Sequence, residues 1–204
     1  MKKFALALVV VCAGLVVANA TGLSPTFEHF AGKIADRFMF YVHVAQLYTR
    51  EPDQKLAMPV QNVSKKAVAN TWGAARGSDR LHQGQDIFAP RGTPIFSATE
   101  GYVARIGVNM LGGQTVSVIG AGGRIYYYAH LDSYAPLLKE GDFVTEETVL
   151  GFVGTTGNAA GTPPHLHFGV YAPGGAVNPL PMIEDRPSAA DKKGEPGKRV
   201  TRKG

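Results

Sequence analysis

The chain has 204 residues, a formal net charge of +5 at pH 7, and hydrophobic residues at 45% of its positions. This length suits one compact domain with appended segments, and no part of the chain resembles a nucleic-acid-binding motif. The single cysteine, Cys12, lies in an apolar N-terminal stretch. If that stretch is removed, no thiol is left for a disulfide or a thiolate metal site, so any metal ion must be bound by histidine and carboxylate.

Residues 1–20 have the pattern of a secretory signal peptide. Lys2 and Lys3 precede a stretch of apolar and small residues at 4–17, and Ala18-Asn19-Ala20 fits a small-x-small cleavage site. The apolar stretch is shorter than the ~20 residues that a membrane-spanning helix needs. We therefore predict an exported protein that is cleaved after Ala20, with an uncleaved N-terminal anchor as the alternative.

Residues 21–57 are predicted to contain a helix and a linker. Within the segment 24–50, aromatic and aliphatic residues recur at three- and four-residue steps, and Pro52 follows as a helix terminator. This apolar helix could pack on the following domain, lie in a membrane surface, or cover a groove and keep the protein inactive. His29 and His43 lie on it without a partner motif, and we interpret both as non-ligands.

Residues 58–183 change to short strands separated by glycine. The glycine-rich turn at 120–123 joins two of these strands in a hairpin pattern. No helix is predicted among them, so the expected fold is mainly β, a compact antiparallel sheet. Strands are predicted at residues 101–106, 115–119, 124–131, 148–153 and 165–171.

Period-two alternation assigns side chains of the last strand to two faces. His165 and His167 share one face, whereas Leu166, Phe168 and Val170 share the other. Because the apolar set is expected to face the core, the two histidines are predicted to face a cleft or solvent.

The same alternation in the strand 124–131 places Tyr126, Tyr128 and His130 on one face. His130, near the end of this strand, is therefore predicted to reach the same cleft. The two tyrosines could line that groove, although their preference for strands explains their presence equally well.

Four histidines and one aspartate lie in three short segments: His82 with Asp86, His130, and His165 with His167. A catalytic zinc ion takes three nitrogen or carboxylate ligands from the protein and leaves a fourth position for water. Two histidines and the aspartate complete that set, and two imidazoles remain for proton transfer and charge stabilisation. This surplus favours an enzyme over a structural zinc site.

The three segments resemble the motifs of the lysostaphin-type (LytM-type) zinc endopeptidases. These motifs are His-x-Gly-x-Asp at 82–86, Tyr-Ala-His-Leu at 128–131, and a Gly-Asn segment that leads to Pro-His-Leu-His-Phe at 157–168. They occur in the order and spacing of that family, and the resemblance extends over about residues 58–181.

The resemblance implies one Zn²⁺ ion per chain, bound by His82, Asp86 and His167, with His165 and His130 as catalytic residues. Zinc lowers the pKa of its bound water to about 7. One unligated imidazole can take the proton from that water, and the other can donate to the developing oxyanion. We favour His165 as the general base and His130 as an orienting or oxyanion-stabilising residue, but the sequence leaves the two roles interchangeable.

The function implied by the resemblance is hydrolysis of peptide cross-links or stem peptides of bacterial peptidoglycan in the cell envelope, either in the periplasm, at a membrane or after secretion. One alternative is a catalytically silent envelope protein that binds the wall or activates an amidase. The presence of all five metal and catalytic residues counts against it. A second alternative is a secreted peptidase that acts on glycine-rich proteins.

One further residue and two further segments each have a functional and a structural interpretation. Arg76 could help to hold an oxyanion or substrate, or it could be a surface or structural arginine. Residues 154–164, rich in Gly, Thr and Pro, could form a wall of the cleft or an ordinary loop.

Residues 184–204 are predicted to be a basic disordered tail, with seven basic and two acidic side chains from position 186 onward. The tail, together with the helix, could contact anionic wall polymer or a membrane surface, or the tail could simply aid solubility.

Overall fold

The computed structural model describes residues 25–76 and 80–186. The signal peptide predicted at 1–20, and the part of the predicted tail from 187 to 204, lie outside these described residues. None of the helices that are described is long and apolar enough to cross a membrane.

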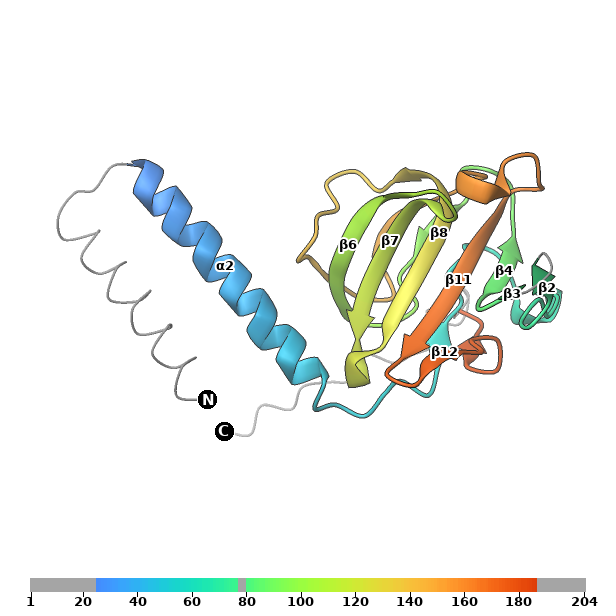
Figure 1. Ribbon diagram of the computed structural model, residues 1–204, viewed down its shortest axis with the longest axis horizontal. Helices are drawn as coiled ribbons and strands as arrows, with labels where there is room; N and C mark the ends of the chain where they lie inside the picture. Colours follow the sequence, from blue (N-terminus) through green and yellow to red (C-terminus); the bar gives the residue numbers. More distant parts are fainter. Residues whose placement is uncertain (1–24, 77–79, 187–204) are drawn as a thin grey trace, which may run out of the picture.

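The predicted helix is α2 (Pro25–Leu47). Its C-terminal half packs on the edge of the β structure, where Phe40 meets Tyr102 edge to face at 6.1 Å between ring centroids and His43 stacks on Tyr102 at 5.3 Å. Leu47 is 4% exposed at the end of the helix. The helix therefore extends from the sheet by one end, as Figure 1 shows.

The β structure in the described residues is one nine-stranded sheet with two small two-stranded sheets. The small sheets pair β1 (Leu56–Ala57) with β13 (Ile183–Glu184), and β2 (Ala75–Arg76) with β3 (Arg80–Leu81). The large sheet contains β4 (Gln85–Phe88), β5 (Pro94–Phe96), β6 (Gly101–Asn109), β7 (Gly113–Gly120), β8 (Ile125–Tyr134), β9 (Phe143–Val144), β10 (Val149–Val153), β11 (His165–Ala172) and β12 (Gly175–Val177).

The large sheet is antiparallel throughout, which confirms the predicted fold class. Its main path runs β12-β11-β8-β7-β6-β9, and β4 also pairs with β11. In Figure 1, α2 lies beyond the β6 side of this sheet, and β2, β3 and β4 lie beyond the β11 side. The chain thus places its helix and its first histidine motif at opposite ends of the molecule.

The core lies under one face of this sheet. Leu166, Phe168 and Val170 of β11 are all 0% exposed, as their alternation predicted. Tyr126 and Tyr128 of β8 are also 0% exposed, so the interpretation that they line a groove is wrong.

The two buried tyrosines have hydrogen-bond partners in the core. The Tyr126 hydroxyl donates to Asp53 at 3.0 Å, and the Tyr128 hydroxyl accepts from the Ala98 N–H at 2.8 Å. Burial raises the pKa of Tyr128 to about 12, so the phenol stays protonated. A tyrosine hydroxyl needs a partner when it is buried, and these two have one.

The alternation that misplaced the tyrosines breaks down just before His130. The pairing of β7 with β8 shifts register between Gln114 and Val116, and His130 itself has a φ of 65°. This left-handed conformation is uncommon for a residue other than glycine. It turns the His130 side chain away from the face that Tyr126 and Tyr128 occupy.

The first residues of the predicted tail belong to the fold. Glu184 is part of β13. Arg186 donates to the carbonyls of Met58 at 2.6 Å and Ser97 at 2.9 Å, and its guanidinium lies 4.7 Å from the centre of the Phe96 ring. Composition could not reveal this order, because it comes from partners far away in the chain.

Candidate metal centre and groove

Three donor atoms converge at the β4–β11 end of the sheet. His82 Nε2 lies 2.8 Å from His167 Nδ1, and Asp86 Oδ1 lies 3.1 Å from each of them. Ligands of a tetrahedral zinc ion with bonds of about 2.0–2.2 Å lie about 3.3–3.6 Å apart. A small outward movement of the three atoms therefore accommodates the ion, and a set of two imidazoles and one carboxylate suits zinc.

Strand pairing brings two of these residues together from distant parts of the sequence. In the antiparallel register of β4 with β11, Asp86 is directly opposite His167. His82 directly follows β3, and a short bend separates it from β4. Gly84 lies in that bend, and a Cβ atom there would lie 2.4 Å from Cε1 of the His167 ring. The glycine of the motif is thus required by the close approach of the imidazole.

Thr71 orients two of the three candidate ligands. Its carbonyl lies 2.7 Å from His82 Nδ1, and its hydroxyl oxygen accepts from the Asp86 N–H at 2.9 Å. Because a carbonyl can only accept, His82 Nδ1 carries the proton and Nε2 keeps its lone pair for a metal ion. Sequence reasoning missed Thr71, which lies in a loop without motif or periodicity.

Gln85 holds the Thr71 loop in place and is itself 0% exposed. Its amide nitrogen donates to the carbonyls of Ala69 at 2.6 Å and Asp86 at 3.0 Å, and its amide oxygen accepts from the Thr71 N–H at 3.3 Å. This residue was also missed. The available signal was a polar side chain beside Asp86, at the alternate position of a strand, where an apolar core residue is expected.

Replacing Gln85 by leucine is expected to destabilise the protein by about 2–4 kcal/mol, because buried backbone groups at Ala69, Thr71 and Asp86 lose their partner. Urea unfolding followed by circular dichroism measures the change. Gln61→Leu is the matched control, since Gln61 is exposed. Equal stability of the two variants would contradict the anchoring role of Gln85.

Asp86 is ionised in this arrangement. Burial raises the pKa of Asp86, but the close contacts of its carboxylate with the His167 and His82 rings outweigh burial and hold the pKa well below its usual range. Burial lowers the pKa of His167, which favours the neutral imidazole that a metal ion requires. Arg76 donates to Asp86 Oδ2, the oxygen that does not face the histidines. This contact fits the structural interpretation of Arg76, because the arginine pairs with a candidate ligand.

The two remaining histidines lie next to this triad with matching orientations. His165 Nδ1 lies 2.8 Å from the Pro163 carbonyl, and His130 Nδ1 lies 2.9 Å from the Thr156 carbonyl. Each ring therefore carries its proton on Nδ1, which leaves Nε2 as a bare acceptor in the neutral form. His165 Nε2 is 4.0 Å from Asp86 Oδ1.

The His130 ring packs among the other site histidines, with its centroid 5.0 Å from that of His165 and 5.8 Å from that of His167. Burial lowers the pKa of His130 to about 4, so its imidazole is neutral at pH 7. All five predicted site residues thus meet in one place.

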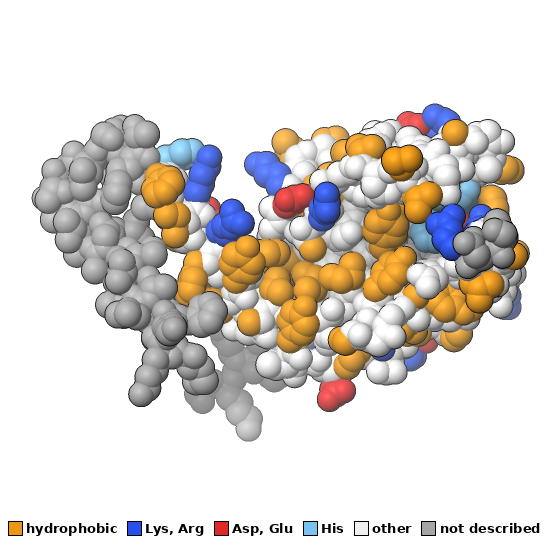
Figure 2. Space-filling model, in the orientation of Figure 1, with side chains coloured by type: hydrophobic (Ala, Val, Ile, Leu, Met, Phe, Trp, Pro, Cys, Tyr) orange, Lys and Arg blue, Asp and Glu red, His pale blue; other side chains and the backbone are white. Residues whose placement is uncertain are grey.

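A groove of about 600 Å³ opens over the candidate ligands. Tyr127, rather than its two neighbours, lines it together with Leu81 and Leu111. From the segment 154–164, Asn158 contributes to the wall, and two carbonyls of the same segment hold His130 and His165. In Figure 2, histidine and arginine or lysine atoms gather at the end of the molecule opposite α2.

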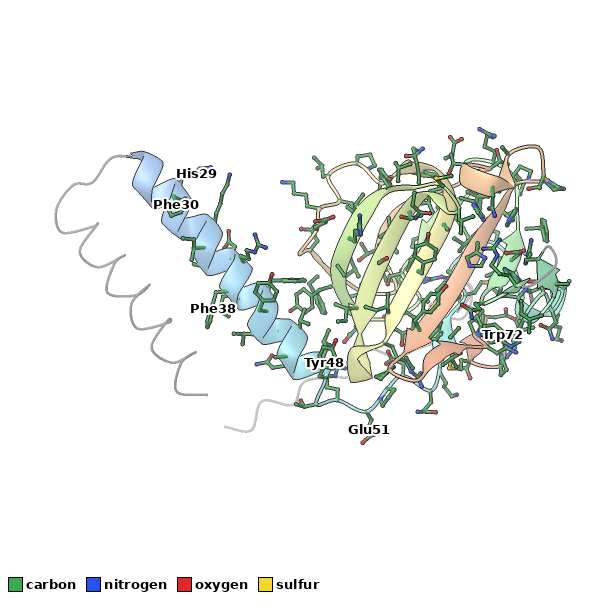
Figure 3. The ribbon with its side chains drawn as sticks, in the orientation of Figure 1. His29, Phe30, Phe38, Tyr48, Glu51 and Trp72 are labelled. Carbon is green, nitrogen blue, oxygen red and sulfur yellow. The ribbon has the colours of Figure 1, made fainter. Side chains whose placement is uncertain are left out.

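The helix does not cover this groove. No described residue of α2 lines it, and α2 packs against the opposite end of the sheet. The hypothesis of a helix that covers the groove is therefore wrong for this structure. Figure 3 shows His29 near the far end of α2, and His43 is stacked on Tyr102, so neither lies near the candidate ligands.

Residues 80–179, which include this centre, match the family described as Peptidase family M23. The chain therefore contains a domain of this family. The match confirms the resemblance drawn from the three motifs, and it places the five histidine and aspartate residues within the family region.

Three relatives illustrate how this M23 chain compares. The L-Ala--D-Glu endopeptidase of Bacillus subtilis is 36% identical over 138 residues, which are 62% of this chain and 42% of that protein. The peptidoglycan DD-endopeptidase ShyC of Vibrio cholerae is 35% identical over 103 residues, 50% of this chain and 23% of that protein. The solved catalytic domain of the antimicrobial peptidase lysostaphin from Staphylococcus simulans superposes with a TM-score of 0.51 at 28% identity, covering 57% of this chain and 92% of that domain. The chain thus spans less than half the length of the Bacillus and Vibrio relatives.

Proposed function

We propose that this chain is an exported, zinc-dependent endopeptidase that hydrolyses peptide cross-links or stem peptides of bacterial peptidoglycan. The observation that carries the proposal is the convergence of His82, Asp86 and His167, whose donor atoms lie within 4.8 Å of one another. Two further imidazoles lie beside them. Membership of a peptidase family, and the names of the Bacillus and Vibrio relatives, support the substrate class.

In this proposal His82, Asp86 and His167 hold the zinc ion, and Thr71 and Arg76 keep two of these ligands oriented. When bound, the ion supplies Lewis-acid chemistry, which activates water and polarises the scissile carbonyl. Asp86 stays ionised and offers Oδ1 to the ion while Oδ2 remains on Arg76. The groove above the ligands receives the peptide.

His165 is the general base in this mechanism. Its Nε2 is 4.0 Å from Asp86 Oδ1, one of the three donor atoms that would hold the ion. The Pro163 carbonyl holds the Nδ1 proton, so Nε2 accepts the proton from water and later delivers it to the leaving amine.

His130 has the orienting role. Its neutral ring carries the proton on Nδ1, so Nε2 accepts a hydrogen bond and has none to donate. An oxyanion needs a donor. Of the two roles considered for His130, these properties support orientation of water or substrate through Nε2 over donation to the oxyanion.

Export belongs to the same proposal and follows from the signal-peptide pattern of residues 1–20 and from a substrate that lies outside the cytoplasm. Localisation within the envelope by the basic tail, through attraction to anionic wall polymer or a membrane surface, is supported by its charge alone.

The test is to incubate the full chain with defined cross-linked muropeptides, with and without a chelator, and to identify the products by mass spectrometry. Cleavage that stops with the chelator and resumes with added Zn²⁺ is expected. Binding to peptidoglycan without cleavage at any pH or zinc concentration would instead favour the silent envelope protein. Cleavage of oligoglycine or elastin-like peptides alone would favour the peptidase of glycine-rich proteins.

A further inference from the structure

Two arginines lie together at the wall of the groove. Arg76 of β2 and Arg80 of β3 are direct partners in the register of this hairpin, and both line the groove. The guanidinium of Arg76 is engaged by Asp86. Arg80, in contrast, has no ion pair or hydrogen bond from its side chain to any residue in the ranges 25–76 and 80–186. As far as the described residues go, one cation of the pair is therefore available to a ligand.

The described lining of the groove does not neutralise Arg80. Asp86 is the sole acidic side chain among the described lining residues, and its two oxygens face Arg76 and the candidate ligand histidines. The remaining lining is largely apolar or aromatic, including Leu81, Leu111 and Tyr171. A bound zinc ion would add further positive charge. The groove therefore complements an anion.

The hairpin also fixes how far Arg80 lies from the reacting bond. The His82 N–H donates to the Ala74 carbonyl at 2.8 Å, so the hairpin pairing continues to the first candidate ligand. Residues two apart in extended chain point to the same side and lie about 6–7 Å apart. A substrate group that is bound by Arg80 is thus about one or two residues along the substrate peptide from the bond held at the metal ligands.

We propose that the groove selects peptides that carry a free carboxylate within one or two residues of the scissile amide, and that Arg80 binds this carboxylate. Guanidinium binds carboxylate through two parallel hydrogen bonds, which gives geometric as well as electrostatic selectivity. The inference rests on the proposed peptidase function and narrows its substrates to acidic stem peptides rather than neutral bridges such as oligoglycine. Arg80 is accordingly a specificity-determining residue.

The test uses the zinc-loaded full chain with pairs of synthetic stem peptides that differ in one group. In one pair the internal D-glutamate α-carboxyl is free or amidated; in the other the C-terminal carboxyl is free or amidated. We expect about a tenfold higher kcat/KM for the free acid of one pair, the size of a partly exposed charge-assisted hydrogen bond. The pair that shows the preference identifies which carboxylate is bound.

Variants distinguish a specific contact with Arg80 from a general effect of positive charge on the protein. Arg80→Gln is expected to remove the preference by raising KM for the acid toward the KM for the amide, and Arg80→Lys is expected to keep part of the preference. Arg105→Gln, a change at an exposed arginine of β6, is the matched control and should keep the full preference. Thermal unfolding verifies that each variant is folded.

A binding measurement tests the inference independently of catalytic turnover. The same peptides are titrated calorimetrically into zinc-loaded His165→Ala protein, with and without Arg80→Gln. Equal affinity for acid and amide would overturn the role of Arg80, even if chelator-sensitive cleavage continues and the proposed function stands. Absence of cleavage with every peptide would count against the proposed function, while the titration still decides the carboxylate preference.

Discussion

Replacing His167 by alanine is expected to remove zinc and activity together. The substitution deletes one of three donor atoms that lie 2.8–3.1 Å apart, and it opens the space beside Gly84. Removing only the hydrogen-bond partner of a metal ligand lowers affinity or activity roughly 10- to 100-fold. Loss of a ligand itself should exceed that range. Metal analysis after dialysis should fall from about one zinc ion per chain to near zero, and muropeptide cleavage should fall to background.

His29→Ala is the control for this experiment, because His29 lies near the far end of α2. It should keep both zinc and cleavage. Asp86→Asn offers a second comparison: the shape is retained, but the charge that pairs with Arg76 and faces the ion is lost. Retention of stoichiometric zinc by His167→Ala would mean that the ion lies elsewhere, and the proposed centre would be wrong.

Replacing His165 by alanine is expected to reduce kcat by about 10²- to 10⁴-fold while zinc stays bound. This range is the usual contribution of a positioned general acid or base. His165 is not one of the three candidate ligands, so its loss should leave the donor set of His82, Asp86 and His167 intact. The measurement combines steady-state kinetics with zinc analysis of the same preparation.

The same experiment on His130→Ala separates the two imidazoles. If His165 is the base and His130 orients the reactants, the loss of kcat should be greater for His165→Ala. The reverse ranking would exchange the two assignments. Loss of zinc from His165→Ala would show that this residue belongs to the metal centre and not to proton transfer.

Strand faces were predicted well where the alternation of residues along the strand matches the faces that are buried in the folded protein. In β11, Leu166, Phe168 and Val170 alternate with histidines along an undistorted strand, so period two assigned both faces correctly. The helix was recognisable from the spacing of its apolar residues, although Phe30, Ile34 and Tyr41 are exposed. In β8 the rule failed: the register shift and the positive φ of His130 put His130 in the groove region while Tyr126 and Tyr128 went to the core.

Residues whose role depends on hydrogen bonds with backbone groups could not be identified from the sequence. Thr71 orients His82 with a carbonyl, which every residue type has, so its identity carries little signal. Gln85 is a polar residue in the core whose purpose depends on where the chain 69–71 passes. We assigned Arg186 to the charged tail. The carbonyls of Met58 and Glu146 that it binds are 128 and 40 residues away in the sequence, so no local pattern indicated them.

The amino-acid sequence by itself determined the family, the mainly β architecture and the five side chains of the candidate centre, because the chemistry of zinc and of proton transfer demands particular residue types at characteristic spacings. Only the folded chain could establish which atoms face one another. It showed that Asp86 uses one oxygen for the histidines and the other for Arg76, that the helix lies away from the groove, and that Arg80 is left without a partner among the described residues. These features depend on strand register and long-range packing, which no local pattern of residues encodes.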